Sequence, residues 1–409
     1  MKKLTAVILL AALMTNTGCA LIETAPGQSE PSEVQTEAPA EPAEQPTEAV
    51  TEPPTEPPTE PPPSAAEERL AAMDLHSKVC QMFIVTPEQL SGYGVVTYSD
   101  EWMQTCYDAY PVGGFILFDQ NITDAEQLKE LNKGLMELTD DTGIGAFISV
   151  DEEGGSISRV QWQLSSDPVG DMVYYGNMND REEAFRAGAA IGKDLAEYGF
   201  NLDFAPVADV NINPYNELGS RIFSTDPEIV SDMSAAVSDG LHSAGICSTL
   251  KHFPGLGAGG ANTHYGSVWM ERSYEELKET EFRAFKGGIE AGADFMLIGH
   301  QIVSGAEDNL PADLSYKITT EWLRDELGFR GLAITDSHSM GAIAYSYSSG
   351  EAAVMAVEAG IDVILMPYDT ADAVSGIEEA VQSGRISEER IDESVLRILG
   401  KKEQMGLLR

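Results

Sequence analysis

The chain has 409 residues, 43% of them hydrophobic, and a formal net charge of −42 with a pI near 4.2. This length and composition suffice for one large buried core or two small ones. The acidic excess excludes a nucleic-acid-binding surface, which requires clustered Lys and Arg, and it disfavours docking on an anionic membrane. A neutral or zwitterionic substrate is therefore the expected partner.

Residues 1–19 have the layout of a secretory signal segment. A basic start is followed by an apolar run that is too short to span a bilayer. The Gly18-Cys19 pair resembles a bacterial lipobox, in which the cysteine is lipidated and becomes the mature N-terminus, although Asn16 stands where that pattern usually has Leu. We expect a lipid anchor on Cys19 and an extracytoplasmic location; a plain signal peptide is the alternative.

Residues 20–64 have the composition of an extended tether. They contain ten Glu and twelve Pro, no Lys or Arg, and three consecutive Thr-Glu-Pro-Pro units. Such a segment cannot bury enough apolar surface to fold, and it favours an extended, partly polyproline II chain. We therefore predict a signal segment over 1–19, a disordered acidic linker over 20–64 and one folded domain over 65–409.

Eight short apolar runs follow in the folded part, and most are rich in Val, Ile, Leu or Phe with little polar alternation. This composition is typical of strands that are buried on both faces, as in a parallel sheet. The predicted strands are 79–85, 114–118, 146–150, 202–207, 247–250, 295–298, 332–335 and 362–366.

Helical patterns occupy the segments between these runs. Leucines recur at helical intervals over 124–138, and Thr123 with Glu126 makes a plausible capping box at its start. Over 227–244, Asp226 is the expected N-cap and a proline follows it at the first helical position. The predicted helices are 124–138, 182–198, 227–244, 273–291, 319–327, 350–359 and 375–383.

Strands that alternate with helices in this way predict an α/β fold, a (β/α)₈ barrel of the TIM type, with a doubly wound open sheet as the competing fold. The ionisable residues favour the barrel, because they lie at or just past the ends of several runs. In a barrel these strand ends converge on one mouth, where active sites form. The residues concerned are Asp151, Asp209, Lys251, His252, His300 and Asp336.

Asp336 directly follows the run 332–335, so the strand is expected to hold its carboxylate rigidly at the rim of the barrel. A carboxylate in this position can attack the anomeric carbon of a sugar and form a glycosyl-enzyme. The alternative is an Asp that caps the next helix, and position alone gives the two equal weight.

Five basic residues are further candidates. Lys251 and His252 carry donors that suit sugar hydroxyls, the alternative being a salt-bridged Lys and a structural His. The forks of Arg159 and Arg221 can hold hydroxyls or a carboxylate bidentately, although local sequence alone favours solvated surface arginines. His264 follows a glycine-rich stretch and suggests a group that swings in during catalysis, where a surface histidine on a flexible loop is the alternative.

The sequence contains no recognisable metal or nucleotide motif. The glycine-rich stretch 255–260 lacks the GxxxxGK[ST] pattern, and no Cys or His spacing suits zinc. Beyond Cys19, the odd set of Cys80, Cys106 and Cys247 does not suit a disulfide framework, and Cys80 and Cys247 are expected to be buried. We expect neither a metal nor a cofactor.

Together these residues resemble glycoside hydrolase family 3, in the single-barrel branch of β-N-acetylhexosaminidases. The resemblance runs from about residue 70 to residue 408, and its motifs are specific only in combination. They are 151–155 (DEEGG) with Arg159, 204–209 (FAPVAD), 251–255 (KHFPG) and 334–336 (ITD).

The resemblance implies a retaining double displacement without a cofactor. Asp336 matches the family nucleophile, and His264 matches the mobile histidine that acts as general acid/base. The residues that match those holding the terminal N-acetylglucosamine are Asp151, Arg159, Arg221, Lys251 and His252. The implied substrates are β-linked N-acetylglucosamine ends, including the N-acetylglucosamine–N-acetylmuramic acid unit of peptidoglycan.

The chain departs from the branch pattern at several positions. Asn262 stands where the branch has an Asp two residues before the mobile histidine, so a carboxylate that would stabilise the imidazolium is missing. We expect Asn262 to orient the ring but to slow protonation of the leaving group, in a step that contributes about 10²–10⁴-fold to the rate. Leu256 and Ala258 replace a usual His and Asp, Glu152 a usual Gln, and Ser156 a usual Arg.

Three functions are compatible with these residues. The first is an active, lipid-anchored glycosidase that removes terminal β-linked N-acetylglucosamine from cell-wall or related glycans, and Asp336 favours it. The second is another β-glycosidase or a glycoside phosphorylase on the same barrel, because fold does not determine the reaction. The third is a catalytically weak glycan-binding lipoprotein, for which Asn262 is the main support.

Overall fold

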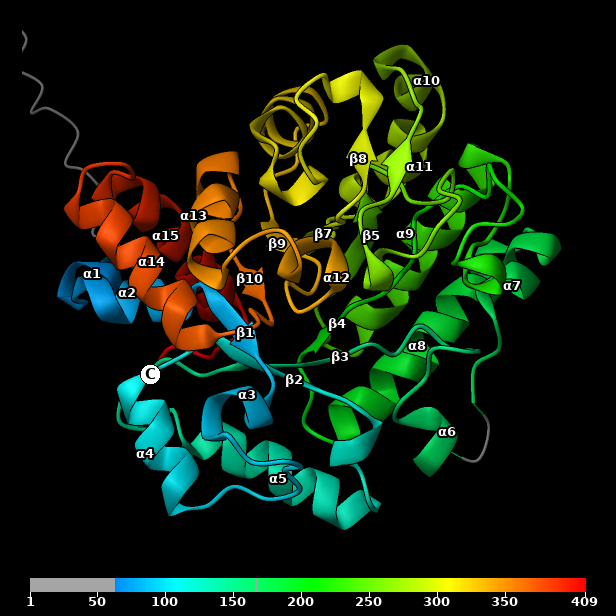
Figure 1. Cartoon of the computed structure of the whole chain (residues 1–409). Helices are drawn as coiled ribbons and strands as arrows, with labels where there is room; N and C mark the ends of the chain where they lie inside the picture. Colours follow the sequence, from blue (N-terminus) through cyan, green and yellow to red (C-terminus); the bar gives the residue numbers. More distant parts are fainter. Residues whose placement is uncertain (1–62, 166–167) are drawn as a thin grey trace, which may run out of the picture. The chain divides into compact units, whose positions relative to one another are not determined.

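The computed structural model describes residues 63–165 and 168–409 (Figure 1). The predicted signal segment with Cys19, and the predicted tether up to residue 62, lie outside the described residues. The first helix, α1 (Ala65–Ala72), begins directly after Ser64. The Ser64 hydroxyl accepts a hydrogen bond from Glu67 N, and the Glu67 carboxylate accepts one from Ser64 N. These two hydrogen bonds form a capping box.

Parallel strands form the centre of the molecule, and each strand pairs with a neighbour on both sides, so that the sheet closes on itself. Hydrogen-bonded neighbours run in the orders β10-β1-β2-β3-β4 and β5-β7-β9. A parallel bridge between Leu202 and Cys247 joins the β4 and β5 segments, and one between Ile334 and Val363 joins β9 to the β10 segment. The strands are β1 (Phe83–Val85), β2 (Gly114–Leu117), β3 (Phe147–Val150), β4 (Leu202–Asp203), β5 (Thr249–Phe253), β7 (Phe295–Ile298), β9 (Leu332–Thr335) and β10 (Ile364–Leu365).

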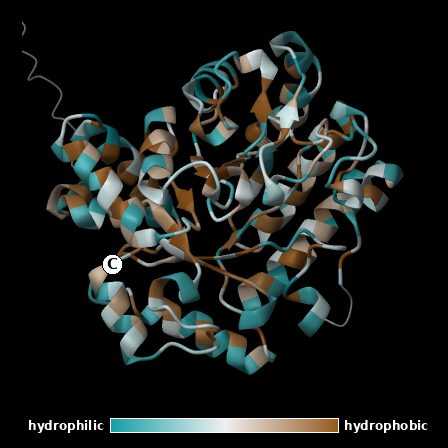
Figure 2. Ribbon diagram, viewed as in Figure 1, coloured by the Kyte–Doolittle hydropathy of each residue, from teal (hydrophilic) through white to brown (hydrophobic). Residues whose placement is uncertain are grey.

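Helices surround these strands in a TIM-barrel-like arrangement, as the alternation in the sequence predicts (Figure 1). The strands carry mostly hydrophobic residues, whereas the helices show hydrophilic residues on their outer faces (Figure 2). The helices that follow successive strands are α4 (Glu101–Ala109), α5 (Ala125–Glu137), α8 (Arg181–Glu197), α9 (Pro227–Ser243), α11 (Glu281–Glu290), the π-helical η6 (Lys317–Glu326), α13 (Ser349–Ala359), and α14 (Thr370–Gln382) with α15 (Glu388–Gln404).

Shorter elements lie mainly in the connections that leave the carboxyl ends of the strands. Strands β6 and β8 form a separate parallel pair outside the barrel. The short elements include α2 (Leu75–Gln81), α3 (Pro87–Ser91), α6 (Gln161–Leu164), α7 (Met172–Met178), β6 (Trp269–Met270), α10 (Tyr274–Glu279), β8 (Ile302–Val303), α12 (Gly341–Ala344) and the 3₁₀ turn η3 (Thr263–Tyr265).

The structure corrects three local predictions. The run 79–85 is not one strand, because its first three residues complete helix α2, which Asp74 caps. The predicted helix 273–291 is broken at Thr280, whose φ of −126° and ψ of −77° are not helical. Helix α5 is capped by Asp124, whose carboxylate accepts hydrogen bonds from the backbone of the first turn, rather than by a box with Thr123.

Other local predictions are confirmed. Asp226 caps α9 by accepting a hydrogen bond from Glu228 N at 3.0 Å. Cys80 and Cys247 are buried, and the cysteines in the described part of the chain are free thiols. Among residues 63–165 and 168–409, no helix has the length and apolar character required to cross a membrane.

Candidate active site

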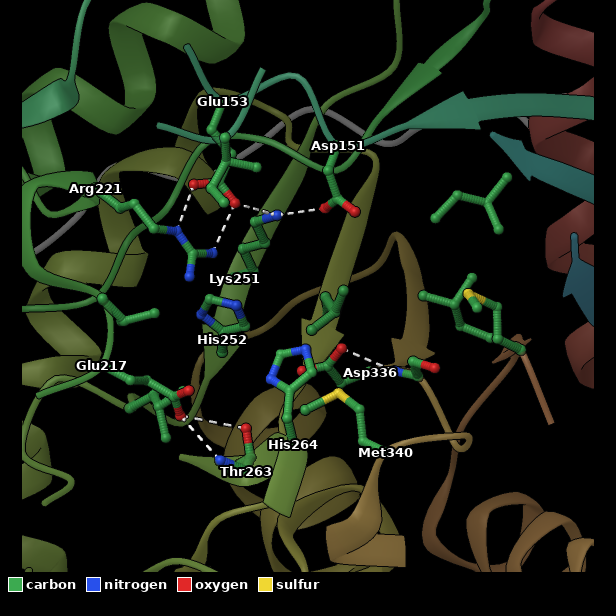
Figure 3. Close-up of a pocket in the computed structure, with 18 of the residues that line it drawn as sticks. Asp151, Glu153, Glu217, Arg221, Lys251, His252, Thr263, His264, Asp336 and Met340 are labelled. Atoms are coloured by element: carbon green, nitrogen blue, oxygen red, sulfur yellow. Dashed lines mark hydrogen bonds and ion pairs between the residues drawn. The ribbon is translucent and has the colours of Figure 1, made fainter. Parts of the chain in front are cut away.

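A cavity of about 400 Å³ lies at the carboxyl ends of the barrel strands (Figure 3). Its walls come from residues at or beyond the ends of β3, β5, β9 and β10, together with the loop that follows β4. The candidate site residues identified from the sequence all line it: Asp151, Arg159, Arg221, Lys251, His252, His264 and Asp336. Residues separated by up to 185 positions in the sequence thus share one cavity, as a barrel requires.

Asp336 is held by backbone contacts on both sides. Its N–H donates to Ile298 O of β7 at 2.8 Å, and its Oδ1 accepts from Ser337 N at 2.7 Å. Burial by itself raises the pKa of the Asp336 carboxyl, but the nearby charges of His300 and His252 and the Ser337 hydrogen bond lower it below its ordinary value. Asp336 is therefore an ionised carboxylate at neutral pH.

A buried His-Asp-His cluster supplies much of that positive charge. His300 Nε2 donates to Ser337 O at 2.9 Å, and its Nδ1 lies 3.1 Å from Asp313 Oδ1. The other Asp313 oxygen lies 2.8 Å from His338 Nε2. Burial opposes protonation of His300, but Asp313 and Asp336 outweigh it and raise the pKa of His300 to about 9. A strand-end position indicated His300, whereas nothing local in the sequence indicated Asp313.

Lys251 and Arg221 are joined by Glu153, a carboxylate within the 151–155 motif that the sequence does not single out as a site residue. Lys251 Nζ lies 2.7 Å from Asp151 Oδ1 and 2.6 Å from Glu153 Oε1. Arg221 holds both Glu153 oxygens, at 2.7 Å each (Figure 3). Burial raises the pKa of Glu153, but the charges of Lys251 and Arg221 outweigh it and lower the pKa to about 2. The network holds the Lys251 and Arg221 side chains against the Asp151 and Glu153 carboxylates on one cavity wall.

His252 is oriented by a buried carboxylate from the preceding strand segment. Asp209 Oδ2 lies 2.8 Å from His252 Nδ1 and accepts a hydrogen bond from His252 N at 3.0 Å. Its other oxygen accepts from Leu256 N at 2.5 Å. Because the carboxylate binds Nδ1–H, the Nε2 edge of the ring is left for a ligand in the cavity.

Arg159 is positioned through its own backbone. The Glu152 carboxylate is buried and accepts hydrogen bonds from Arg159 N and Val160 N at 2.7 Å each, and also from the Ser158 hydroxyl. Burial raises the pKa of Glu152 despite these hydrogen bonds. The Glu that replaces the usual Gln of the family pattern thus organises the turn that presents Arg159 to the cavity.

His264 lies in η3, within the loop that follows β5. Asn262 Oδ1 accepts a hydrogen bond from His264 N at 2.9 Å and lies 3.1 Å from His264 Nδ1. An amide oxygen has no hydrogen and can only accept, so His264 Nδ1 carries a hydrogen in this contact. Nε2 is the ring nitrogen that Asn262 does not contact. Asn262 therefore orients the imidazole without adding a charge, as we expected.

Two residues of the loop after β4 form hydrogen bonds with the loop that carries His264. Glu217 lines the cavity, and its Oε1 accepts from Thr263 N at 3.2 Å and from Thr263 Oγ1 at 3.3 Å (Figure 3). Asn213 binds the same loop nearer its start, at Gly257 O and Gly259 O, each at 2.9 Å. Glu217 was not indicated by the sequence, because its partner is 46 positions away.

The part of the chain that the structure describes contains no group of three or more His, Cys, Asp or Glu side chains arranged to hold a metal ion. The cavity instead offers ionised carboxylates, two paired cations and two imidazoles. This set can hold the hydroxyls of a neutral polar molecule and can provide both a nucleophile and a proton donor.

Comparison with known proteins places this site in a family context. The model for the glycosyl hydrolase family 3 N terminal domain matches residues 75–400. Beta-hexosaminidase A of Pseudoalteromonas piscicida is 29% identical over 322 residues, which cover 72% of this chain and 54% of that protein. A beta-hexosaminidase of Tolumonas auensis is 34% identical over 265 residues, covering 64% of this chain and 78% of that protein.

A solved structure agrees with these relatives. The glycoside hydrolase family 3 beta-N-acetylglucosaminidase from Paenibacillus sp. str. FPU-7 is 33% identical, with a TM-score of 0.77, over 82% of this chain and 63% of that chain. This chain thus spans about half the length of the Pseudoalteromonas relative and under two thirds of the Paenibacillus chain. Because the family model covers most of the chain, the protein belongs to glycosyl hydrolase family 3.

Proposed function

We propose that the protein is a retaining β-N-acetylhexosaminidase that removes terminal β-linked N-acetylglucosamine from cell-wall or related glycans. The observation that carries the proposal is the ionised, half-buried Asp336 in the same cavity as His264, opposite a wall of paired charges. The relatives named as beta-hexosaminidases and the beta-N-acetylglucosaminidase structure support the choice of sugar.

The reaction takes two steps. Asp336 attacks the anomeric carbon and forms a glycosyl ester, while the imidazolium form of His264 gives its Nε2 proton to the departing oxygen of the aglycone. His264 Nε2 then takes a proton from water, the water oxygen bonds to the anomeric carbon, and the Asp336 carboxylate leaves. The two inversions give net retention.

The remaining residues hold the sugar. Asp151 and the His252 Nε2 edge offer hydrogen-bonding atoms to ring hydroxyls, and the Arg221 and Lys251 cations stay in place because Glu153 binds both. A preformed site of this kind binds without first ordering its own side chains, so more of the interaction free energy goes into positioning the substrate.

Release of p-nitrophenol from its β-N-acetylglucosaminide tests the proposal. We expect turnover by the wild type, none detectable by Asp336→Ala, and a loss of about 10²–10⁴-fold in His264→Ala. Asp325→Ala, which removes an exposed carboxylate on η6, is the matched control and should keep wild-type activity. A wild type that is inactive at every pH would refute the proposal and favour a glycan-binding protein or a different sugar.

One observation supports a second candidate reaction, transfer of the sugar to phosphate. Asn262 brings no negative charge beside His264, so a phosphate acceptor meets less repulsion there than it would beside a carboxylate. Repeating the assay with and without phosphate separates the two reactions, because only a phosphorylase yields the sugar 1-phosphate.

We further propose that Cys19 carries a lipid that anchors the enzyme on the outer side of the membrane, on the strength of the signal layout and the Gly18-Cys19 pair. In this proposal the acidic tether separates the barrel from the anchor. Fractionation of cells that express wild type or Cys19→Ala tests the anchor: the variant should lose the lipid and appear in the soluble fraction.

A further inference from the structure

A second cavity, of about 380 Å³, lies at the amino ends of β9 and β10. Its walls come from η6, from the turns that lead into these two strands, and from α15. The catalytic cavity lies at the opposite ends of the strands and shares no residue with it. Although the chain carries a net charge of −42, four arginines line this second cavity, and we call them the arginine cluster: Arg324, Arg330, Arg390 and Arg397.

One buried carboxylate is shared by two arginines of the cluster. Asp362 is fully buried, and its two oxygens lie 2.5 Å from Arg324 Nη2 and 2.8 Å from Arg397 Nη1. The same carboxylate accepts hydrogen bonds from Ser394 Oγ at 2.7 Å and from Ala333 N at 3.0 Å. Each oxygen of Asp362 thus accepts two hydrogen bonds, which uses the capacity of the carboxylate.

The other two arginines of the cluster have no carboxylate partner. Arg390 donates to two backbone oxygens and to the Ser394 hydroxyl. Arg330 donates through Nη1 alone, to Arg324 O at 2.8 Å and to Phe329 O at 3.3 Å. Within the described part of the chain, neither guanidinium forms an ion pair, so these two charges are held in place by neutral groups.

Three carboxylates also line the cavity, but none of them pairs with the cluster. Glu358 is held by Arg385, which lies outside the cavity, through two contacts of 2.8 Å. Asp325 and Glu393 are exposed, and neither forms an ion pair with any residue that the structure describes. Water therefore solvates these two carboxylates at the rim.

The pKa values agree with an excess of positive charge. Burial lowers the pKa of Arg324 and of Arg390 below the ordinary value, and the charge of Arg397 lowers both further. Asp362 opposes both shifts and Glu393 opposes that of Arg390, but they do not outweigh burial and repulsion. The chain itself thus compensates the cluster only in part.

Arg330 and Arg397 both keep free the edge of the guanidinium that binds oxyanions. Through Nε and Nη2, an arginine can bind two oxygens side by side. In the catalytic cavity, Glu153 occupies this edge of Arg221, at 2.7 Å from each nitrogen. In Arg330 and Arg397 the same two nitrogens have no hydrogen-bond partner among the described residues. Both side chains reach solvent, so a dissolved anion can contact them.

We propose that this cavity binds a phosphate group, either as free phosphate or as a phosphate monoester. Two arginine edges require oxygens that point in different directions, which a tetrahedral phosphate offers and a flat carboxylate does not. A phosphate monoester carries a charge of about −1.5 to −2 at pH 7, which would compensate the cluster. The ring of Tyr316, which lines the cavity and is 56% exposed, offers a face for the organic part of an ester.

The acidic character of the whole chain does not prevent such binding. The net charge of −42 repels an anion at long range, but salt screens this repulsion beyond about 10 Å at about 0.1 M ionic strength. Contacts with the arginine cluster therefore decide the affinity. The site is separate from the acceptor position that a phosphorylase would use beside His264, because the two cavities share no residue.

Calorimetric titration of the full chain with inorganic phosphate and with glycerol 3-phosphate tests the proposal. The wild type should bind at least one of them. Arg330→Gln and Arg397→Gln should each weaken that binding about tenfold or more, because each removes a charge-assisted contact. Arg186→Gln removes an arginine of α8 that is 57% exposed and lies outside both cavities, so it should keep the wild-type affinity. Tighter binding of the ester would identify a monoester as the ligand, and the reverse would identify free phosphate.

Arg330→Gln is the decisive variant, because Arg330 is exposed and its loss leaves no buried charge unpaired, whereas Arg397→Gln removes a partner of Asp362. Wild-type affinity in Arg330→Gln would overturn the proposal, since the phosphate would then bind elsewhere, as in the catalytic cavity. Failure of the wild type to bind either compound would also overturn it. Acetate that binds as tightly as phosphate would contradict the choice of a tetrahedral anion.

Discussion

Asp336 is half-buried in the cavity wall, and the charges of its neighbours keep it ionised. An unpaired buried carboxylate takes up a proton, since burial disfavours the charged form. Here His300 and His252 face the carboxylate, and Asp313 in turn keeps His300 protonated. The charge of Asp336 therefore depends partly on a second layer, formed by His300 and Asp313, which do not line the cavity.

This layer predicts a pH-dependent contribution to stability. The pKa of His300 is about 9 in the folded protein and has its ordinary value of 6.5 when unfolded, so folding strengthens proton binding. The stabilisation is fully present below about pH 6.5 and is lost as the pH rises through 9. Relative to His300→Gln, the wild type should lose on the order of 3 kcal/mol between these pH values in urea unfolding. Parallel pH profiles of the two proteins would argue that His300 is neutral.

A second prediction at this scale concerns the hydrogen bonds between Glu217 and Thr263. Removing the side chain in Glu217→Ala frees Thr263 and lets the neighbouring His264 move, and displacements of about 1 Å cost up to about 10²-fold in rate. We expect kcat to fall at least tenfold. Glu217→Gln retains an oxygen that accepts the same hydrogen bonds, so it should restore most of kcat. If Gln is as damaging as Ala, the carboxylate acts on the substrate and not through Thr263.

At the scale of elements, helices α8 and α9 pack with their backbones nearly touching. A Cβ built on Gly240 would lie 2.4 Å from Phe185 O, and one built on Gly188 would lie 2.2 Å from Val237 O. The two glycines therefore allow an approach that any side chain would prevent. This close packing holds the two helices that precede and follow β4.

The close approach reverses the usual effect of replacing a helical glycine. Gly240→Ala should destabilise the fold by about 1–3 kcal/mol, as overpacking does, measured by chemical denaturation. The matched control is Gly400→Ala in α15, where nothing lies within 4 Å of the built Cβ. There we expect a gain of about 0.5–1 kcal/mol from helix propensity alone. Stabilisation by both substitutions would show that α8 and α9 can separate without loss.

At the scale of the whole molecule, the C-terminal segment covers the amino ends of the first strands. The Gly145 N–H donates to Leu407 O at 2.7 Å, and Ile144 pairs with Leu408. Lys402 is fully buried there, where Nζ lies 2.7 Å from Gln81 Oε1 and 2.9 Å from Gly113 O. This end of a barrel contributes to stability, whereas the opposite end carries the chemistry.

Burial lowers the pKa of Lys402 to about 7, from an ordinary value of 10.5. Folding therefore weakens proton binding, and the buried ammonium destabilises the fold most below about pH 7 and progressively less as the pH rises toward 10.5. The stability of the wild type relative to Lys402→Met should rise by on the order of 3 kcal/mol between about pH 7 and pH 9.5. The variant also loses the hydrogen bonds of Lys402, but this loss changes its stability equally at both pH values. A constant difference would contradict the lowered pKa.

Much of the barrel could be predicted from local patterns. Strands 295–298 and 332–335 are β7 and β9 without change, because an apolar run between turn-forming residues specifies a buried strand. The run 79–85 was misassigned, because a buried helical turn and a buried strand have the same apolar composition. The break at Thr280 also escaped prediction, since both halves of 273–291 have helical periodicity.

The sequence by itself determined the barrel class and the seven candidate residues of the cavity, because strand ends and motifs are local features of the chain. Only the tertiary structure decided their partners: Glu153 between two cations, Asp313 beside His300 near Asp336, and Glu217 on the loop of His264. These pairings join loops from different strands, and their distances depend on how the barrel closes. The charges of His300 and His252, which lower the pKa of Asp336, likewise come together only in the closed fold.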